Sequence, residues 1–165
     1  MSNSRYLAEE INASKYFYAG IFPPVLKNKL NIKQAEELAK RENEIIMINF
    51  PLRPILTKFT LQEIQTVHYS LFRDIYDWAG KLRDYTTGRG NVPFARPEMI
   101  ESFYHKQIFL ALQQENYLQN CAKSKFIKKS AYFINEFNAI HPFIDGNERL
   151  TRIFLQDLAL NVVLH

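Results

Sequence analysis

Hydrophobic residues recur every three or four positions along most of the chain, the spacing of amphipathic helices. The first such stretch, residues 32–48, is rich in Ala, Glu, Leu and Lys and precedes the proline-containing segment 50–54, so we expect a helix and then a turn. In the second stretch, Thr60 precedes the apolar series and Glu63 follows three residues later. This spacing predicts a capping box and a helix that runs to about Trp78.

His68 lies on the apolar stripe of this second helix. A histidine in such a place is more often a core residue with satisfied hydrogen bonds than a ligand. We therefore interpret it as a core residue and do not place it in the functional site.

The pattern changes between residues 83 and 96. Residues 85–87 have strand propensity, residues 88–91 are turn formers, and Val92-Pro93-Phe94 is extended in character. A short hairpin is the best interpretation. By itself it reads as a connector, whereas beside an active site it could hold a peptide by strand addition.

Helical spacing then returns in three segments. Pro97 opens a helix to about Gln114, a second covers Lys123 to Ile140, and Pro142 interrupts it before a last helix over residues 150–162. Repeats, low-complexity tracts and linkers are absent from the sequence. The predicted fold is all-α, a helical bundle with one short β-hairpin, as a single domain over residues 1–165.

Composition narrows the class of protein. Hydrophobic residues make up 47% and charged residues 23% of the chain, which is ordinary for a folded soluble protein. No apolar run approaches the ~20 residues that cross a bilayer, and residues 1–6 do not resemble a signal peptide. We expect a cytoplasmic protein without membrane contact, in which the lone Cys121 is a structural thiol.

The charge is mildly basic, with a net value of +4 and a pI near 9.1. The one cluster of lysines, within residues 123–129, is interpreted as a solvated helix face. Specific nucleic-acid binding usually requires a denser basic patch, so we do not expect it.

The twelve residues from His141 to Arg152 contain most of the candidate chemistry. A histidine at the end of one helix is followed by a turn that opens the next, and a helix N-terminus with Gly146 favours an anion. His141 could accept a proton at neutral pH, and Asp145 could hold Mg²⁺ together with substrate phosphates.

Guanidinium groups complete this set of residues. Arg149 and Arg152 are neighbours on one helix face, and their guanidinium groups match phosphate oxygens. Each feature also has a plain structural reading: residues 145–148 as a capping box, the arginines as a solvated face, and His-Pro as a helix end.

As a set, these residues resemble the signature of the Fic domain family, H-x-F-x-[D/E]-G-N-[G/K]-R-x-x-R, at every fixed position except Glu148. Upstream, Trp78-Ala79-Gly80 with Arg83 resembles the family's W-A-G-x-x-R stretch, and residues 25–30 resemble its entry segment. The similarity covers roughly residues 20–160.

The resemblance implies a helical enzyme that moves AMP from ATP, with Mg²⁺, onto a Ser, Thr or Tyr hydroxyl of a protein substrate. It assigns His141 as general base, Asp145 to the metal, and Gly146 and Asn147 to the anion hole. Arg149 and Arg152 would neutralise the outer phosphates.

The hairpin becomes the family's substrate flap, with Val92, Pro93 and Phe94 on its outgoing strand. Two alternatives stay open: a kinase-like phosphotransferase on the same fold, and a catalytically silent module that binds a nucleotide or protein.

Glu148 departs from the family pattern, which has Gly in most members and Lys in a phosphorylating subgroup. A carboxylate about 4 Å from a phosphate costs up to ~4 kcal/mol at an effective dielectric near 20 if it cannot turn away. Glu148 could pair with Arg152 and inhibit from within the motif, or it could point outward and leave transfer intact.

Inhibition in this family comes from a glutamate on an inhibitory helix. Glu42-Asn43 resembles the end of that motif, but Leu38 stands where Ser or Thr is expected, so we predict an ordinary helix there. Because thirteen residues follow Arg152, we expect inhibition to come from a separate antitoxin-like protein or from Glu148.

Overall fold

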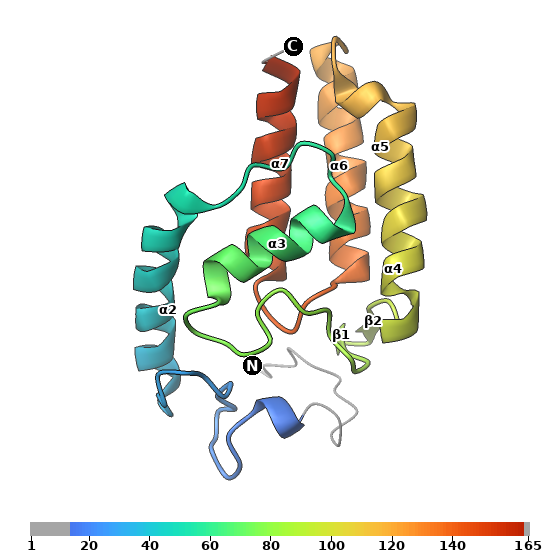
Figure 1. Ribbon diagram of the computed structural model, residues 1–165. Coiled ribbons are helices and arrows are strands. Elements are labelled where there is room, and N and C mark those ends of the chain that lie inside the picture. The colour runs from blue at the N-terminus through green and yellow to red at the C-terminus, as the bar shows by residue number, and fades with distance from the viewer. Residues whose placement is uncertain (1–13, 164–165) are drawn as a thin grey trace.

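The protein is mainly helical in the computed structural model, which describes residues 14–163 (Figure 1). Helices α6 (Lys123–Ile140) and α7 (Asn147–Val163) run antiparallel, and α3 (Leu61–Phe72) crosses in front of them. Helix α2 (Ala35–Asn49) stands on the opposite side from the segment after the hairpin. The predicted helical fold with one hairpin is confirmed.

The core lies where α3, α6 and α7 meet. Phe154 of α7 contacts Phe59 edge-on at a ring-centroid distance of 5.2 Å and Phe137 of α6 at 6.0 Å. All three side chains are fully or almost fully buried. Burial of each phenyl group contributes about 1.5–3 kcal/mol, so these contacts stabilise the packing of α6 and α7 against each other and against the segment that leads into α3.

Helix α3 begins as predicted but ends earlier. Its last residue is Phe72, six positions before the predicted end at Trp78. The N–H of Lys29 donates to the carbonyl of Ile75 (2.8 Å), and the Lys29 ammonium donates to the carbonyl of Arg73 (2.7 Å). These contacts with the entry segment occupy carbonyls that a longer helix would have used internally.

The capping box at the start of α3 is only half formed. The hydroxyl of Thr60 accepts the N–H of Glu63 (3.2 Å), as predicted. The Glu63 carboxylate does not return to Thr60; it accepts the N–H groups of Lys58 (2.9 Å) and Phe59 (2.7 Å). Glu63 therefore organises the approach to the helix as well as its first turn.

The hairpin is shorter than its sequence suggests. Strands β1 (Gly88–Arg89) and β2 (Val92–Pro93) pair antiparallel, and the N–H of Phe94 adds one bond to the carbonyl of Thr87 (3.0 Å). Residues 85–87 do not form the predicted strand. Tyr85 is buried and its carbonyl accepts from the Arg83 guanidinium (2.8 Å), which holds this stretch against the helices.

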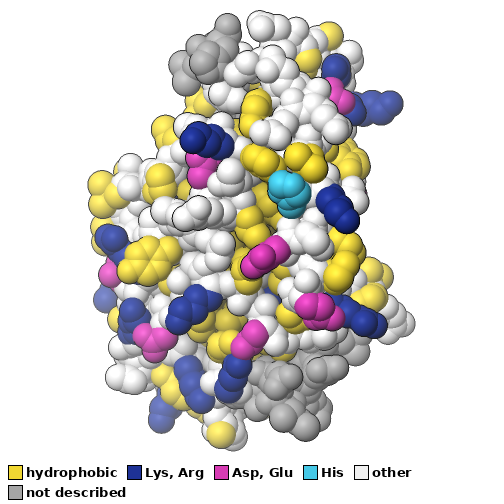
Figure 2. All heavy atoms as spheres, turned by 45° about the vertical axis from the view of Figure 1, so that its right-hand side comes forward, with side chains coloured by type: hydrophobic (Ala, Val, Ile, Leu, Met, Phe, Trp, Pro, Cys, Tyr) yellow, Lys and Arg dark blue, Asp and Glu magenta, His cyan; other side chains and the backbone are white. Residues whose placement is uncertain are grey.

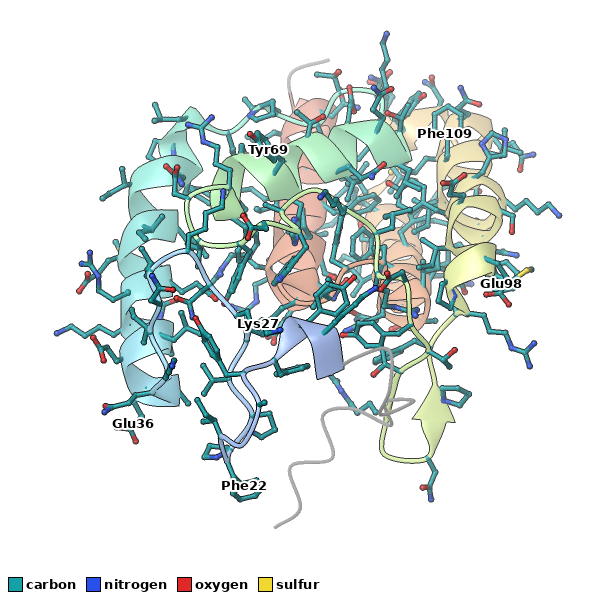
Figure 3. All side chains as sticks on the ribbon, turned by 60° about the horizontal axis from the view of Figure 1, so that its bottom comes forward. Phe22, Lys27, Glu36, Tyr69, Glu98 and Phe109 are labelled. Carbon is teal, nitrogen blue, oxygen red and sulfur yellow. The ribbon has the colours of Figure 1, made fainter. Side chains whose placement is uncertain are left out.

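The segment after the hairpin is helical over the predicted range with a change of pitch inside it. A 3₁₀ turn (Pro97–Met99) leads into α4 (Ile100–Phe103), a π-helical segment (Tyr104–Phe109) and α5 (Leu110–Gln114). A further 3₁₀ turn, Asn116–Leu118, precedes α6. Figure 3 shows this column, with Glu98 and Phe109 labelled, beside the bundle.

The first described residues form a short 3₁₀ helix (Ser14–Tyr16), followed by an isolated bridge between Phe17 and Leu26. Phe22, at the tip of the loop between them, projects away from the body (Figure 3). Residues 1–6, on which the signal-peptide expectation rests, lie outside the described residues. Within residues 14–163, no helix has both the length and the apolarity needed to span a membrane.

Candidate functional site

His141 ends α6 in a left-handed conformation, with φ 48° and ψ 64°. Its N–H donates to the carbonyl of Phe137 (2.9 Å), which completes the last turn of the helix. The imidazole stacks face to face on Phe94, with centroids 3.9 Å apart and planes 5° apart. The candidate base therefore touches the predicted flap, because Phe94 directly follows β2.

A buried arginine joins the flap to this histidine. The Arg83 guanidinium donates to the carbonyls of four residues: Tyr85 (2.8 Å), Ala95, Ile140 (3.0 Å) and His141 (2.6 Å). Burial lowers the pKa of Arg83 to about 10, so the group stays charged at neutral pH. No carboxylate among residues 14–163 forms an ion pair with it.

Arg83 thus caps the carbonyl end of α6, where the helix dipole is negative, and holds both ends of the hairpin to it. The sequence comparison identified Arg83 only as part of a motif. Its role could not be predicted from the sequence, because its acceptors are backbone carbonyls that lie up to 58 positions from Arg83 along the chain.

Asp145 and Gly146 form the turn into α7. The Asp145 carboxylate is half-buried, and its Oδ1 accepts the N–H of Gly146 (2.7 Å). Gly146 has φ +81°, and a Cβ there would lie 2.6 Å from two ring carbons of Phe72. Glycine is therefore required here because the loop packs closely against α3, on the side that faces the protein.

Asn147 stabilises the loop through its side chain. It is buried, donating from Nδ2 to the carbonyl of Phe143 (2.8 Å) and accepting the N–H of the same residue at Oδ1 (2.9 Å). The amide group is thus used within the loop. An anion at this helix start would meet backbone N–H groups of the first turn, which have no acceptor inside a helix.

Arg149 is held by α2. Its guanidinium contacts Glu42 (3.3 Å) and Asn43 (3.0 Å) and lies over the Phe72 ring at 5.8 Å. Tyr76 donates its hydroxyl to the other oxygen of Glu42 (2.7 Å), and burial raises the pKa of Glu42. A helix is present here as predicted, from Ala35 to Asn49, but it is not an ordinary helix remote from the site, because two of its residues contact the first motif arginine.

Glu148 and Arg152 form an ion pair one turn apart on α7, at 2.5 Å. Their side chains are 72% and 78% exposed, respectively. Glu148 therefore both pairs with the second arginine and faces solvent. Such exposed pairs contribute about 0–1 kcal/mol, so a phosphate group needs little free energy to replace the carboxylate.

A groove of about 290 Å³ adjoins the arginines between α2 and α7. Its lining combines apolar and cationic side chains: Ile46, Met47, Phe50, Arg149, Arg152, Ile153 and Gln156. A larger hollow, about 690 Å³, lies between α3 and the column of residues 98–109, and none of the loop residues 141–152 lines it. Only the smaller groove is thus continuous with the candidate site.

Asp145 is the candidate metal ligand of the loop. Within residues 14–163, no group of three or more His, Cys, Asp or Glu side chains is arranged to hold an ion. Mg²⁺ does not need such a cage, since it is commonly bound by one or two carboxylates together with substrate phosphates. Asp145 supplies a carboxylate of this kind beside a helix N-terminus.

His68 also belongs next to the site, contrary to our sequence interpretation. It is a buried core residue with satisfied hydrogen bonds, as predicted, but one of those bonds reaches the carbonyl of Asp145 (3.1 Å). Burial lowers the pKa of His68 to about 3, so the ring is neutral at neutral pH. The two residues are 77 positions apart, so this contact could not be predicted from local sequence pattern.

The surface charges are of both signs. Figure 2 shows basic and acidic side chains interspersed over one face of the molecule. In the lysine-rich part of α6, Lys125 and Lys129 both pair with Glu115, at 2.8 and 2.6 Å. This part of α6 is the solvated helix face that the sequence predicted.

The last two helices and the loop between them carry a histidine, a carboxylate and two arginines, which makes this a helical domain with its candidate site at a helix–loop–helix. The sequence model of the Fic/DOC family matches residues 58–159. The chain belongs to this family, and the resemblance inferred from the motif is confirmed.

Relatives and solved structures agree with that assignment. The chain is 32% identical to the "probable protein adenylyltransferase Fic" of Escherichia coli K12 over 88% of its length and 72% of that protein. It is 36% identical to protein adenylyltransferase VbhT of Bartonella schoenbuchensis, over 86% of the chain but only 30% of that protein. BepC of Bartonella tribocorum, solved with bound AMPPNP, gives a TM-score of 0.79 at 29% identity, covering 90% of this chain and 78% of that one.

Proposed function

We propose that the protein is an adenylyltransferase that moves AMP from ATP onto a Ser, Thr or Tyr hydroxyl of a protein substrate in the cytoplasm. The observation that carries the proposal is the contact between His141 and Phe94, which places the candidate base against the hairpin. Relatives named protein adenylyltransferases and the AMPPNP-bound neighbour support the nucleotide and the reaction.

In this proposal the hairpin positions the target. Among the described residues β2 pairs only with β1, and Val92 and Pro93 are exposed, so an extended segment of the target can lie along the other edge of β2. His141 then accepts the proton of the target hydroxyl, whose oxygen attacks the α-phosphorus while pyrophosphate leaves. Positioning and charge stabilisation provide most of the rate in such a transfer.

The remaining loop residues hold the nucleotide. Asp145 would bind Mg²⁺, which neutralises charge on the phosphates when present. First-turn N–H groups of α7, from Asn147 onward, would receive a phosphate oxygen, and Arg149 and Arg152 the outer phosphates. The N–H of Gly146, which now donates to Oδ1 of Asp145, would join them only if that bond opens when the carboxylate binds Mg²⁺. Because Glu42 and Asn43 already orient Arg149, little side-chain entropy remains to be lost on binding.

Glu148 should attenuate this activity only mildly. The Glu148 side chain is 72% exposed, so its carboxylate interacts with a phosphate through a water-like dielectric. At 4 Å the repulsion between the two groups is then about 1 kcal/mol, compared with ~4 kcal/mol for a carboxylate that cannot move. The cost is about fivefold in nucleotide affinity. We therefore favour an outward-facing Glu148 with retained transfer over complete inhibition from within the motif.

Regulation by a separate antitoxin-like protein fits the groove between α2 and α7. An amphipathic helix could place apolar residues on Ile46, Met47 and Phe50 and an acidic residue near Arg152. Such a partner would compete with the outer phosphates for the same guanidinium group.

The test uses ATP labelled at the α or at the γ phosphate, with Mg²⁺ and a soluble bacterial protein extract as acceptor. Wild type and Glu148→Gly should transfer label from α and not from γ, and His141→Ala should transfer neither. Label from γ alone would establish the kinase-like alternative. No label from wild type or Glu148→Gly, with nucleotide binding intact, would establish a silent binding module.

A further inference from the structure

We propose that His68 is a positioning residue that holds the backbone of Asp145, and through it the direction of the metal-binding carboxylate. The inference rests on the proposed function, in which Asp145 binds Mg²⁺. His68 lies in the middle of α3 and its side chain is completely buried. Since none of its surface is exposed, it cannot touch a bound nucleotide, and any effect on binding must pass through the loop.

The ring is fixed by aromatic neighbours on both faces. Phe143 of the loop stacks on it with centroids 4.0 Å apart and planes 15° apart, and Phe72 of α3 lies 4.6 Å away at 29°. Trp78 adds a tilted contact at 5.9 Å. A side chain enclosed in this way keeps a single orientation, so both ring nitrogens can hold their hydrogen bonds at the same time.

The hydrogen bonds define the protonation of the ring. The N–H of Gly80 points at Nδ1 (2.8 Å), and since an amide N–H only donates, Nδ1 must be the acceptor. The proton of the neutral ring is therefore on Nε2, which donates to the carbonyl of Asp145 (3.1 Å). His68 thus connects the Trp78-Ala79-Gly80 turn to the phosphate loop.

The carbonyl that His68 anchors belongs to the Asp145–Gly146 peptide unit, which has two further contacts. Oδ1 of Asp145 accepts the N–H of Gly146, and the α-carbon of Gly146 packs so closely on Phe72 that a Cβ would overlap the ring. Loss of the Nε2 bond would free the Asp145–Gly146 peptide to rotate, and the carboxylate would turn with it. Partners that orient a metal ligand in this way are commonly worth 10- to 100-fold in metal affinity.

Two substitutions separate the hydrogen bonds. In His68→Asn, the amide oxygen can replace Nδ1 as acceptor for Gly80, but the side chain is too short to reach Asp145. In His68→Gln, the terminal amide can replace Nε2 as donor to Asp145, while the bond from Gly80 is lost. Both variants lose the ring stacking, so they serve as matched controls for stability.

The experiment measures binding of ADP and of a non-hydrolysable ATP analogue by calorimetry, across a Mg²⁺ titration, with thermal unfolding recorded for each variant. We expect His68→Asn to raise the half-saturating Mg²⁺ concentration about tenfold or more, and His68→Gln to stay within about twofold of wild type. Binding without Mg²⁺ should change little in either. Equal shifts in both variants, or a shift in neither, would overturn the inference.

Asp145→Ala in the same titration distinguishes the two levels of the proposal. If this variant loses the Mg²⁺ dependence and His68→Asn keeps it, the positioning role alone is wrong. If Asp145→Ala keeps the Mg²⁺ dependence of wild type, the metal assignment in the proposed function is wrong, and the role of His68 falls with it.

Discussion

Replacement of Gly146 by alanine tests why the loop requires glycine. Two costs arise from the structure. An L-residue at φ +81° loses roughly 1–2 kcal/mol through backbone sterics. The new Cβ would also stand 2.6 Å from two ring carbons of Phe72, which is fully buried and cannot swing into solvent. Overpacking of this kind costs about 1–3 kcal/mol.

The expected destabilisation of Gly146→Ala is therefore about 2–5 kcal/mol, measured by urea unfolding at neutral pH. Gly90→Ala is the matched control, since Gly90 has φ +60° but nothing within 4 Å of an added Cβ. It should lose about 1–2 kcal/mol, the backbone cost alone.

Phe72→Leu in combination with Gly146→Ala isolates the steric cost. Removal of the ring should relieve the clash, so the double variant should be more stable than the sum of the single effects by about 1 kcal/mol or more. If Gly146→Ala matches Gly90→Ala, or if the double variant is additive, packing on Phe72 is not the reason for this glycine.

Three further predictions concern stability. Arg83→Met leaves carbonyls of α6 and the hairpin without their charged donor, and such hydrogen bonds contribute about 1.5–3 kcal/mol each. We therefore expect the free energy of unfolding in urea to fall by at least ~3 kcal/mol. A fall of less than about 1 kcal/mol would contradict the capping role. Asp157→Ala leaves the buried Arg53 guanidinium without the carboxylate that binds it at 2.7 Å, and should lower the free energy of unfolding by about 3–5 kcal/mol in the same assay. An unchanged free energy of unfolding would refute the pairing. Partial burial pushes the pKa of Asp84 upward, but hydrogen bonds from Lys15 and Tyr16 outweigh it and leave the pKa below its usual value. The stabilisation is thus present above the unfolded pKa and lost as pH falls through the folded one. At pH 7, Asp84→Asn should lower the stability measured by thermal unfolding by less than ~1 kcal/mol, because the Lys15–Asp84 pair is half-exposed. In strong acid the variant and wild type should be equally stable.

Local pattern predicted most of the helices because their apolar stripes and caps lie within short windows of sequence. Helix α6 has the predicted bounds, and Thr60 caps α3 as expected. The errors occurred where distant residues compete for backbone groups. Lys29 binds carbonyls beyond Phe72 and shortens α3, which no property of residues 73–78 reveals.

The candidate site was predictable in the same uneven way. His141, Asp145 and the two arginines fall within twelve residues, so one helix–loop–helix brings them together. His68 and Arg83, by contrast, act on backbone carbonyls of that loop from elsewhere in the chain. These two contacts are seen only in the folded structure, because every residue has a backbone carbonyl and the residue type does not show which one accepts a hydrogen bond.

Mass spectrometry of acceptor proteins after incubation with MgATP and the protein tests the proposed AMP transfer itself. We predict peptides in which a Ser, Thr or Tyr carries an AMP group, formed by wild type and absent with His141→Ala. Phosphate in place of AMP, or AMP adducts that form equally with His141→Ala, would contradict it.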